Sequence, residues 1–253
     1  MRKNVEPMPA KRALITASAS GIGAATARAL STEGYEVVVS DIDADAGAAL
    51  AAEIGGRFVA CDLAKADQIE ALVAEAGPVS VLVNNGGVSG PTAPVPDITP
   101  EEWNATFAVN VTAMFLACRL VVPQMTADGG GTIVNLSSVA GKIGYPNRAP
   151  YAASKWAVLG FTASLAREVA TAGIRVNAIM PASVRGPRIQ SVIEAYAEKN
   201  GLSVAEAEAQ YLARQATKAF VEPEEVARTV VFLASDAARS INGAFLPIDG
   251  GFD

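Results

Sequence analysis

Short apolar runs rich in valine and isoleucine alternate along the chain with longer alanine-rich stretches. Runs that are apolar throughout are typical of strands buried on both faces, and their alternation with helices favours a parallel sheet. The pattern predicts seven strands, at 13–16, 36–41, 57–61, 79–84, 132–137, 175–180 and 244–248. It predicts helices at about 23–32, 44–54, 66–76, 100–122, 151–171, 190–218 and 223–234.

This order of elements predicts the fold class. We expect an α/β protein, a single-domain doubly wound Rossmann fold with a seven-stranded parallel sheet, over residues 1–253. The sequence shows no internal repeat and no low-complexity linker. One connection, from Pro181 to about Glu222, is unusually long and rich in polar and charged residues. We expect it to form a helical lid over a substrate, at about 182–222.

Composition narrows the classes of partner. A net charge of -6 and a pI near 4.9 argue against nucleic acid, which needs a concentrated basic surface. No run approaches the roughly eighteen apolar residues of a membrane span, and the first ten residues lack the apolar core of a secretory signal. We therefore expect a cytoplasmic protein with no membrane partner. Cys61 and Cys118 have no CxxC spacing, which predicts buried free thiols.

The chain has no histidine, so acid/base chemistry must rest on tyrosine, lysine or carboxylates, and we expect no metal site. Tyr151 and Lys155 stand four residues apart in a predicted helix and therefore project from one face. A cation beside a phenol favours the phenolate and lowers the phenol pKa from about 10 toward a useful range. Taken alone, this spacing more often marks an ordinary helix surface.

A glycine turn follows the first predicted strand, in the segment from Thr16 to Gly23. Glycines allow close approach of a pyrophosphate, and the following helix presents free N–H groups to it. Twenty positions after Gly21, a strand ends in Asp41. A carboxylate there accepts hydrogen bonds from the adenosine ribose hydroxyls and repels a 2'-phosphate, which predicts NAD as the cofactor. The alternative is a glycine-rich helix entry that binds nothing.

Further motifs occur in order along the rest of the chain. With the glycine turn and the Tyr-x-x-x-Lys pair they make the sequence resemble the short-chain dehydrogenase/reductase family over essentially its whole length. These motifs are Asp62-Leu63, Asn84-Asn85-Gly86-Gly87, Asn110-Val111, Ser137-Ser138, Arg175-Val-Asn177 with Pro181, and Ile248-Asp249-Gly250-Gly251.

The resemblance implies roles for the candidate residues. Tyr151 is then the general acid/base, and Lys155 lowers its pKa and holds the nicotinamide ribose. Ser138 polarises the carbonyl, and Asn110 anchors a water chain; the less favoured alternative for Asn110 is a helix packing residue. Asn84 supports the sheet and cofactor site. The cofactor contacts expected beside Tyr151 and Lys155 are Thr16, Ser18, Ser20, Gly21, Ile22, Gly23, Asp41, Ile42, Asp62, Leu63, Asn85, Gly86, Gly87, Pro181 and Val184.

Four positions depart from the family pattern. Ala17 replaces the first glycine of the turn, where a methyl group disfavours a positive φ and is expected to reduce cofactor affinity. Gly86 replaces an alanine, which we expect to be tolerated while loosening the strand end. Ala182 replaces a glycine after Pro181, and Gly186 replaces a threonine that touches the carboxamide in the family.

These observations predict an NAD-dependent oxidoreductase that interconverts a secondary alcohol and a ketone by hydride transfer, with Tyr151 exchanging the proton. One alternative is an NADPH-dependent 3-oxoacyl-carrier-protein reductase. Asp41 counts against it, as does the absence of Arg or Lys between Thr16 and Gly23. Another alternative is a dinucleotide sensor without turnover, which would not need the Ser138, Tyr151 and Lys155 set.

Two further hypotheses concern partners. Arg185 and Arg188 begin the predicted lid and Arg148 precedes Tyr151, so the small-molecule substrate is hypothesised to carry an anionic group. The alternative is that these arginines are solvated or pair with lid carboxylates such as Glu194 and Glu198. The helix from Tyr151 is apolar on more than one face, which suggests a subunit interface. The resemblance implies a homotetramer.

Overall fold

The computed structural model describes residues 11–252 and shows a seven-stranded sheet with the order β3-β2-β1-β4-β5-β6-β7. All its strand pairs are parallel. The predicted fold class is confirmed, and each predicted strand lies within two residues of an observed one. The strands are β1 (Arg12–Thr16), β2 (Glu36–Asp41), β3 (Arg57–Ala60), β4 (Val81–Asn84), β5 (Gly131–Leu136), β6 (Ile174–Pro181) and β7 (Phe245–Ile248).

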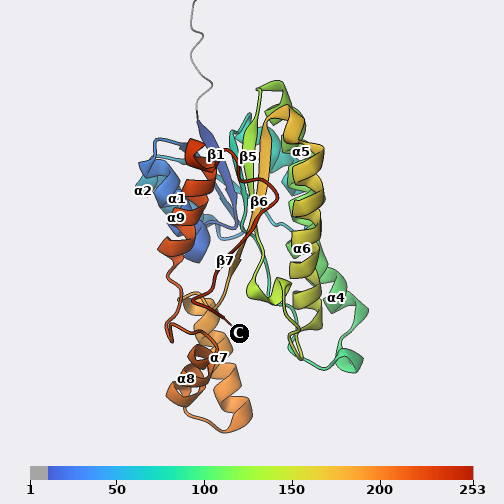
Figure 1. Ribbon diagram of the computed structural model, residues 1–253, viewed down its shortest axis with the longest axis vertical. Helices are drawn as coiled ribbons and strands as arrows, with labels where there is room; N and C mark the ends of the chain where they lie inside the picture. Colours follow the sequence, from blue (N-terminus) through green and yellow to red (C-terminus); the bar gives the residue numbers. More distant parts are fainter. Residues whose placement is uncertain (1–10, 253) are drawn as a thin grey trace, which may run out of the picture.

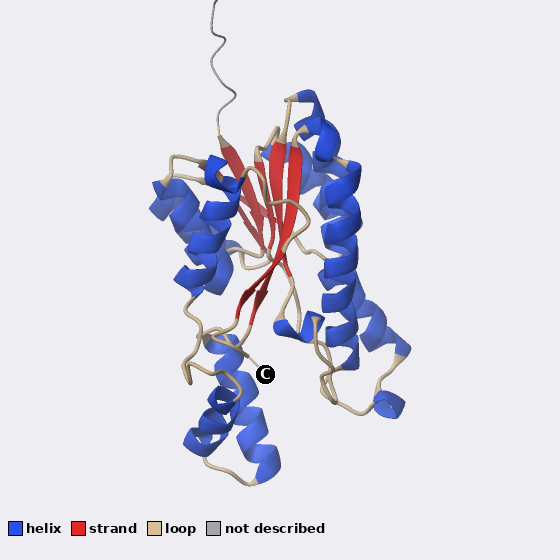
Figure 2. Cartoon of the chain, in the orientation of Figure 1, coloured by secondary structure: helices blue, strands red, loops and turns tan. Residues whose placement is uncertain are grey.

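Helices cover both faces of the sheet (Figures 1 and 2). One face carries α1 (Gly21–Thr32), α2 (Ala44–Ile54) and α9 (Pro223–Ala234). The other carries α3 (Ala66–Ala76), α5 (Ala113–Ala127) and α6 (Ala149–Glu168), with α4 (Pro100–Phe107) at its end. Short 3-10 turns lie at Val95–Asp97, Val139–Gly141, Ala170–Ala172 and Asp236–Ala238.

Side-chain alternation along the strands builds a separate core on each face. In β1, Leu14 faces the core under α3, α5 and α6, whereas Ala13 and Ile15 face the core under α1, α2 and α9. All three side chains are fully buried. This two-sided burial is why the strands read as continuous apolar runs. The strand order reverses between β1 and β4, and ligands bind in the crevice at the carboxyl ends of such strands.

The long connection after β6 folds as two helices, so the predicted single helix at 190–218 is wrong. Helix α7 (Pro187–Asn200) ends at Gly201, whose φ is +64°. Helix α8 (Val204–Ala213) begins after Ser203, which forms a capping box with Glu206. Both stop and start signals are present in the sequence. The two helices project beyond the carboxyl ends of β6 and β7 (Figure 1), and the role of this segment as a lid stays a prediction.

The helix predicted at 100–122 also differs in detail. It runs continuously from Pro100 to Ala127 through a π-helical turn at Ala108–Thr112, and it passes Pro123. Proline lacks the N–H that a helix interior uses, yet the helix continues for four residues beyond Pro123. By length and composition alone, these 28 residues are apolar enough to cross a membrane. A core helix of a folded protein can be equally long and apolar, and in this fold Ala117 and Val121 pack into the core.

Candidate active site

The turn between β1 and α1 presents backbone N–H groups at a helix start. Gly21 has a φ of +53°, and a Cβ at this residue would meet no heavy atom of the described residues within 4 Å. Ser20, the N-cap of α1, makes no side-chain capping hydrogen bond within residues 11–252. The first-turn N–H groups and the helix dipole therefore remain available to an anion. This geometry fits a dinucleotide pyrophosphate at Ser20, Gly21, Ile22 and Gly23.

The end of β2 faces this turn through a carboxylate. Asp41 Oδ2 accepts a hydrogen bond from the Ala19 N–H at 2.9 Å, and Oδ1 accepts one from the Asp43 N–H at 3.1 Å. These two bonds fix the carboxylate beside the predicted ribose position. The next side chain, Ile42, is 72% exposed, which leaves it open to contact an adenine.

Three of the expected cofactor residues build the turn from inside. The Thr16 hydroxyl accepts hydrogen bonds from the N–H groups of Asn85 and Gly86, at 3.1 and 3.2 Å. The Asn85 amide donates to the carbonyl oxygens of Thr16 and Ala17. Ser18 is fully buried, and its hydroxyl donates to the Ile15 carbonyl. These side chains tie the ends of β1 and β4 together and support the cofactor surface.

Ala17 adopts the left-handed conformation in spite of its methyl group, with a φ of +50°. The methyl group therefore does not prevent the turn from forming. For a residue with a Cβ, the left-handed conformation costs about 1–2 kcal/mol of conformational free energy. Gly23 is required by close packing, because a Cβ there would lie 2.6 Å from the Ala17 carbonyl oxygen.

Lys155 is buried, with 4% of its surface exposed, and reaches from α6 to the end of β5. Its Nζ donates to the Leu136 carbonyl at 2.8 Å and lies 5.7 Å from the centre of the Tyr151 ring. The predicted neighbourhood of phenol and ammonium is therefore confirmed. A Cβ on Gly87 would lie 3.3 Å from both Lys155 Nζ and Asn110 Oδ1, which is closer than most Cβ contacts. Glycine avoids this crowding between the two side chains.

Ser138 lies two residues after the end of β5 and is the N-cap of the 3-10 turn Val139–Gly141, where its hydroxyl accepts a hydrogen bond from the Ala140 N–H at 3.2 Å. This turn is attached to α6 at two points. The Ser137 hydroxyl donates to the Lys155 carbonyl at 2.8 Å, and a Cβ on Gly141 would lie 2.8 Å from the same oxygen. The turn thereby holds Ser138 against the helix that carries Tyr151.

Asn110 lies in the π-helical turn and is 3% exposed. Its Oδ1 accepts from the Val88 N–H at 2.7 Å, while its Nδ2 donates to the Val88 carbonyl and to the Ser154 hydroxyl. Ser154 in turn donates to the Tyr151 carbonyl at 2.7 Å. The side chain therefore positions the loop after β4 and the start of α6. Its role toward a water chain stays a prediction.

Asn84 supports the central sheet as expected, because its Nδ2 donates to Asn135 Oδ1 at 2.9 Å. A Cβ on Gly86 would lie 2.1 Å from Leu63 Cδ1, so the leucine fills the space of the missing methyl group. Asp62 Oδ1 accepts a hydrogen bond from the Ala64 N–H.

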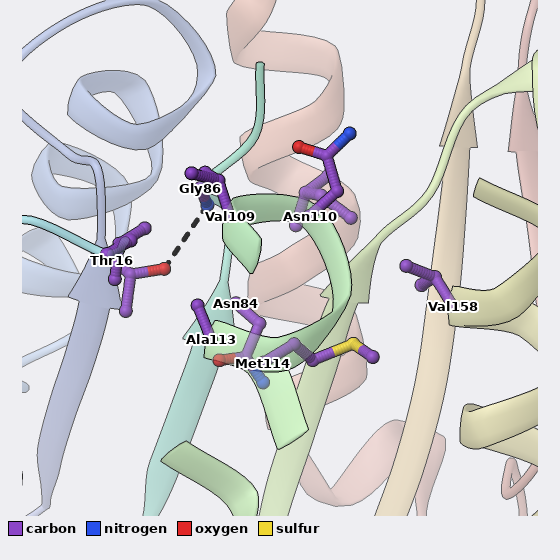
Figure 3. A pocket seen from close by; sticks show the side chains of 10 residues that line it. Thr16, Asn84, Gly86, Val109, Asn110, Ala113, Met114 and Val158 are labelled. Atoms are coloured by element: carbon purple, nitrogen blue, oxygen red, sulfur yellow. Dashed lines mark hydrogen bonds between the residues drawn. The ribbon is translucent and has the colours of Figure 1, made fainter. Parts of the chain in front are cut away.

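A small cavity lies behind the ends of these strands, with Thr16 hydrogen-bonded to Gly86 at its rim (Figure 3). It is lined by Thr16, Leu63, Asn84, Gly86, Val109, Asn110, Ala113, Met114, Leu136 and Val158.

The segment after β6 leads into the lid. Pro181 ends the strand, and the following N–H, that of Ala182, donates to the Ile248 carbonyl at 3.1 Å. Val184 pairs with Val221 in an isolated bridge that closes the base of the lid. Gly186 has a φ of +150° and is the N-cap of α7, a conformation that the threonine usual at this position would rarely adopt.

The described arginines hypothesised to bind an anion differ in their surroundings. Arg185 forms an ion pair with Glu222 at 2.8 Å, so its partner is a carboxylate other than Glu194 or Glu198. The side chain of Arg188 lies outside the described residues. Arg148 lies beside the candidate acid/base residue, with its guanidinium carbon 5.2 Å from the centre of the Tyr151 ring.

The sequence analysis did not identify Tyr145, Tyr211 or Arg214; in the structure Arg148, Arg214 and Tyr211 all interact with Tyr145. No local motif marks them, and only the fold of the lid brings Tyr211 and Arg214 to this place. The two cysteines are free and buried as predicted. Across the described residues, no group of three or more His, Cys, Asp or Glu gathers as metal ligands would.

Residues 16–253 match the family described as enoyl-(acyl carrier protein) reductase. D-beta-hydroxybutyrate dehydrogenase of Cupriavidus necator is 37% identical over 252 residues, covering 96% of this chain and 97% of the relative. D-threitol dehydrogenase of Mycolicibacterium smegmatis is 38% identical over 263 residues, covering 96% and 92%. The crystal structure of an actinorhodin polyketide ketoreductase with NADPH superposes with a TM-score of 0.92 at 35% identity, covering 98% of both chains.

These matches extend over nearly the whole chain. Among the motifs behind the resemblance, the glycine turn, the Asn84–Gly87 segment and Ser137-Ser138 lie at the carboxyl ends of β1, β4 and β5, which are neighbours in the sheet. The chain is therefore an oxidoreductase and belongs to the short-chain dehydrogenase/reductase family.

Proposed function

We propose that this protein interconverts a secondary alcohol and a ketone with NAD(H). The bound nicotinamide would supply or accept the hydride, and the chain must handle the alcohol proton. Among the described residues, Tyr151 is the side chain best placed to do so, since Lys155 Nζ lies 5.7 Å from its ring centre. Two relatives act, by name, on hydroxyl-bearing small molecules, D-beta-hydroxybutyrate and D-threitol.

The residues divide the work in the following way. Ser138 is held beside α6 by the Val139–Gly141 turn and would donate a hydrogen bond to the substrate oxygen. Tyr151 would give its proton to that oxygen during reduction and take it back during oxidation. The Lys155 ammonium favours the phenolate form electrostatically and would also bind the nicotinamide ribose. Asn110 fixes the start of α6 through Ser154.

The observation that carries the choice of NAD is the Asp41 carboxylate, held by the Ala19 N–H at 2.9 Å. A carboxylate fixed at this position accepts hydrogen bonds from the ribose hydroxyls of NAD and repels the 2'-phosphate of NADP. The competing candidate is an NADPH-dependent 3-oxoacyl-carrier-protein reductase, which the NADPH-bound polyketide ketoreductase favours as a structural neighbour. Against it, Ile42 and Asp43 follow Asp41, where a 2'-phosphate site would need a cation.

The test is a turnover screen of secondary alcohols and ketones with both cofactors, followed at the nicotinamide absorbance. The proposal expects turnover, and a higher kcat/KM with NAD(H) than with NADP(H). Turnover confined to NADPH and carrier-protein-bound 3-ketoesters would favour the competing candidate. Binding of NADH without turnover of any alcohol or ketone would favour the dinucleotide sensor.

We also propose that the protein is a cytoplasmic homotetramer. Several residues of the predicted two-faced helix, among them Val158 and Leu165, are buried within the chain. Two large aromatic side chains stay exposed on neighbouring helices: Phe115 of α5 is 44% and Trp156 of α6 is 53% exposed. Such exposed aromatic residues are typical of subunit contacts. Light scattering during size-exclusion chromatography would give the mass, and Trp156→Glu should reduce it.

A further inference from the structure

Guanidinium groups and aromatic rings link the lid to the catalytic helix. Tyr145 lies in the loop before α6, and the guanidinium carbons of Arg148 and Arg214 lie 6.0 and 5.6 Å from the centre of its ring. Arg148 precedes α6, whereas Arg214 directly follows α8 of the lid. Two cations from distant parts of the sequence therefore sit around one ring.

Arg148 is the member of this cluster next to the chemistry. Its guanidinium carbon is 5.2 Å from the Tyr151 ring centre, and its Nη2 donates to the Ser89 carbonyl at 3.1 Å. Its Nε is buried and has no hydrogen-bond partner among the described residues. A buried donor without an acceptor costs about 1–3 kcal/mol. A ligand that supplies an acceptor at this point would remove that cost.

Arg214 is held in place by the C-terminal segment. Its guanidinium carbon lies 4.5 Å from the centre of the Phe252 ring. The chain just after it is bonded to the same segment, because the N–H groups of Ala216 and Thr217 donate to the carbonyls of Gly251 and Gly250 at 3.1 and 3.0 Å. The arginine side chain is exposed, so it is both positioned and accessible to a ligand.

Within residues 11–252, no acid balances the charge of this cluster. Arg12, Arg28 and Arg185 each form an ion pair with a glutamate. Neither Arg148 nor Arg214 has a carboxylate oxygen of the described residues within 4.0 Å. Two such guanidinium groups beside one tyrosine ring are unusual in a chain whose net charge is -6. They create a local positive field beside the catalytic tyrosine.

The lid adds a phenol to the same cluster. Tyr211 of α8 interacts with Tyr145 and lies near Arg148, and its ring packs edge-on against Tyr196 with centres 5.5 Å apart. Burial, reinforced by Tyr145, raises the pKa of Tyr211 to about 12. The hydroxyl therefore keeps its proton at neutral pH and is a hydrogen-bond donor there.

We propose that Arg148 and Arg214, joined through Tyr145, form a carboxylate-binding subsite beside Tyr151. The substrate is then a hydroxy or oxo monocarboxylate whose anionic group lies a few bonds from the reacting carbon. Guanidinium forks match carboxylate geometry, and the lid must be in place for Arg214 to take part. This inference rests on the proposed function. It moves the anion site away from Arg185, whose charge is balanced by Glu222.

Binding of two isosteric probes tests the subsite without turnover. Butyrate and butyramide differ in charge, and their affinities for the protein saturated with NAD+ can be compared by calorimetry. We expect wild type to prefer butyrate by at least about tenfold, or ~1.4 kcal/mol. Arg148→Gln and Arg214→Gln should each remove most of this preference. Arg148→Lys and Arg214→Lys, which keep the charge without the fork, should retain part of it.

Arg185→Gln is the matched control, because it removes a lid arginine that already has a carboxylate partner; its preference should equal that of wild type. Equal binding of butyrate and butyramide by wild type would overturn the subsite. So would a preference that survives in both Arg148→Gln and Arg214→Gln. Circular dichroism and NADH binding establish that each variant is folded.

Failure of the proposed function would look different. In that case neither charged nor neutral secondary alcohols would reduce NAD+ or NADP+, while the preference for butyrate persisted. Turnover of neutral alcohols by a protein without a preference for butyrate would overturn the subsite and leave the proposed function standing.

Discussion

The Asp41 carboxylate and the Ala19 N–H are joined by a hydrogen bond of 2.9 Å, which ties the end of β2 to the turn after β1. The same carboxylate accepts a bond from Asp43 on its other oxygen. A carboxylate held at both oxygens cannot rotate away from an incoming phosphate. In the proposed function, discrimination between NAD and NADP would therefore depend on the backbone of the turn that would bind their pyrophosphate.

The first prediction concerns this discrimination. Wild type should favour NAD(H) over NADP(H) by at least about tenfold in kcat/KM, or ~1.4 kcal/mol. The double change Asp41→Ala with Ile42→Arg removes the repulsion and adds a cation, so it should narrow or reverse the ratio. Asp43→Asn is the control, because it removes a charge two residues away while keeping an oxygen to cap α2. Equal use of both cofactors by wild type would contradict the assignment.

The second prediction concerns the acid/base pair. Tyr151→Phe keeps the ring and deletes the proton-carrying oxygen, so turnover should fall by about a hundredfold or more. NADH affinity, measured by fluorescence titration, should change little. Lys155→Ala should reduce both turnover and NADH affinity, since the ammonium is assigned to the phenol and to the ribose. Near-normal turnover by Tyr151→Phe on a good substrate would rule out the proposed mechanism.

The fold followed from the sequence because a parallel sheet buries both faces. Strands such as Val37 to Val39 are apolar throughout, and the helices between them are long and rich in alanine. The predicted helix bounds were wrong at two places where sequence signals for helix and for helix ends conflict. Gly201 with Ser203 marks a helix break that the polar pattern of the lid hides, whereas Pro123 is tolerated in a helix that tertiary packing holds.

The site was only partly predictable for a different reason. The candidate residues Tyr151, Lys155 and Asp41 lie in local motifs, so spacing and element ends are enough to propose them. The hydroxyls of Thr16 and Ser18 belong to the same motif, yet both side chains point into the turn they stabilise. Motif membership alone does not distinguish a ligand contact from a scaffold. Arg214 lies in no motif and reaches the site only because the lid folds back toward the loop that holds Tyr145.

The third prediction concerns the buried thiols. Burial raises the pKa of Cys118 to about 12 and that of Cys61 to about 11, so both stay protonated in the folded protein at pH 8. Ellman's reagent should react with neither thiol of the native protein within minutes and with both in concentrated urea. Because the thiol pKa values are higher in the folded than in the unfolded protein, they also make stability depend on pH. The free energy of unfolding should be unaffected by the thiols below about pH 9 and should fall as pH rises toward 11–12. Rapid labelling of native protein would contradict the burial.

The fourth prediction tests whether Leu63 compensates for Gly86. Gly86→Ala restores a methyl group where Leu63 Cδ1 now lies, so it should destabilise the protein by about 1–3 kcal/mol through overpacking. Leu63→Ala should also destabilise, because it leaves a gap beside the cavity. The double variant should lose clearly less than the two losses together, as measured by urea unfolding. Additive losses would mean that the two positions do not share one space.

The last prediction concerns the strained turn residue. Ala17 has a φ of +50°, a conformation that costs about 1–2 kcal/mol for a residue with a Cβ and very little for glycine. Ala17→Gly relieves this strain but adds freedom to the unfolded chain, at about 0.4–1 kcal/mol. The variant should therefore be more stable than wild type by up to about 1 kcal/mol in urea unfolding, and it should bind NADH more tightly. Gly34→Ala is the matched control, because Gly34 has a φ of +81° and open space around it, so only backbone strain is added and stability should fall. If Ala17→Gly were less stable than wild type and bound NADH less tightly, the strain attributed to this residue would be wrong.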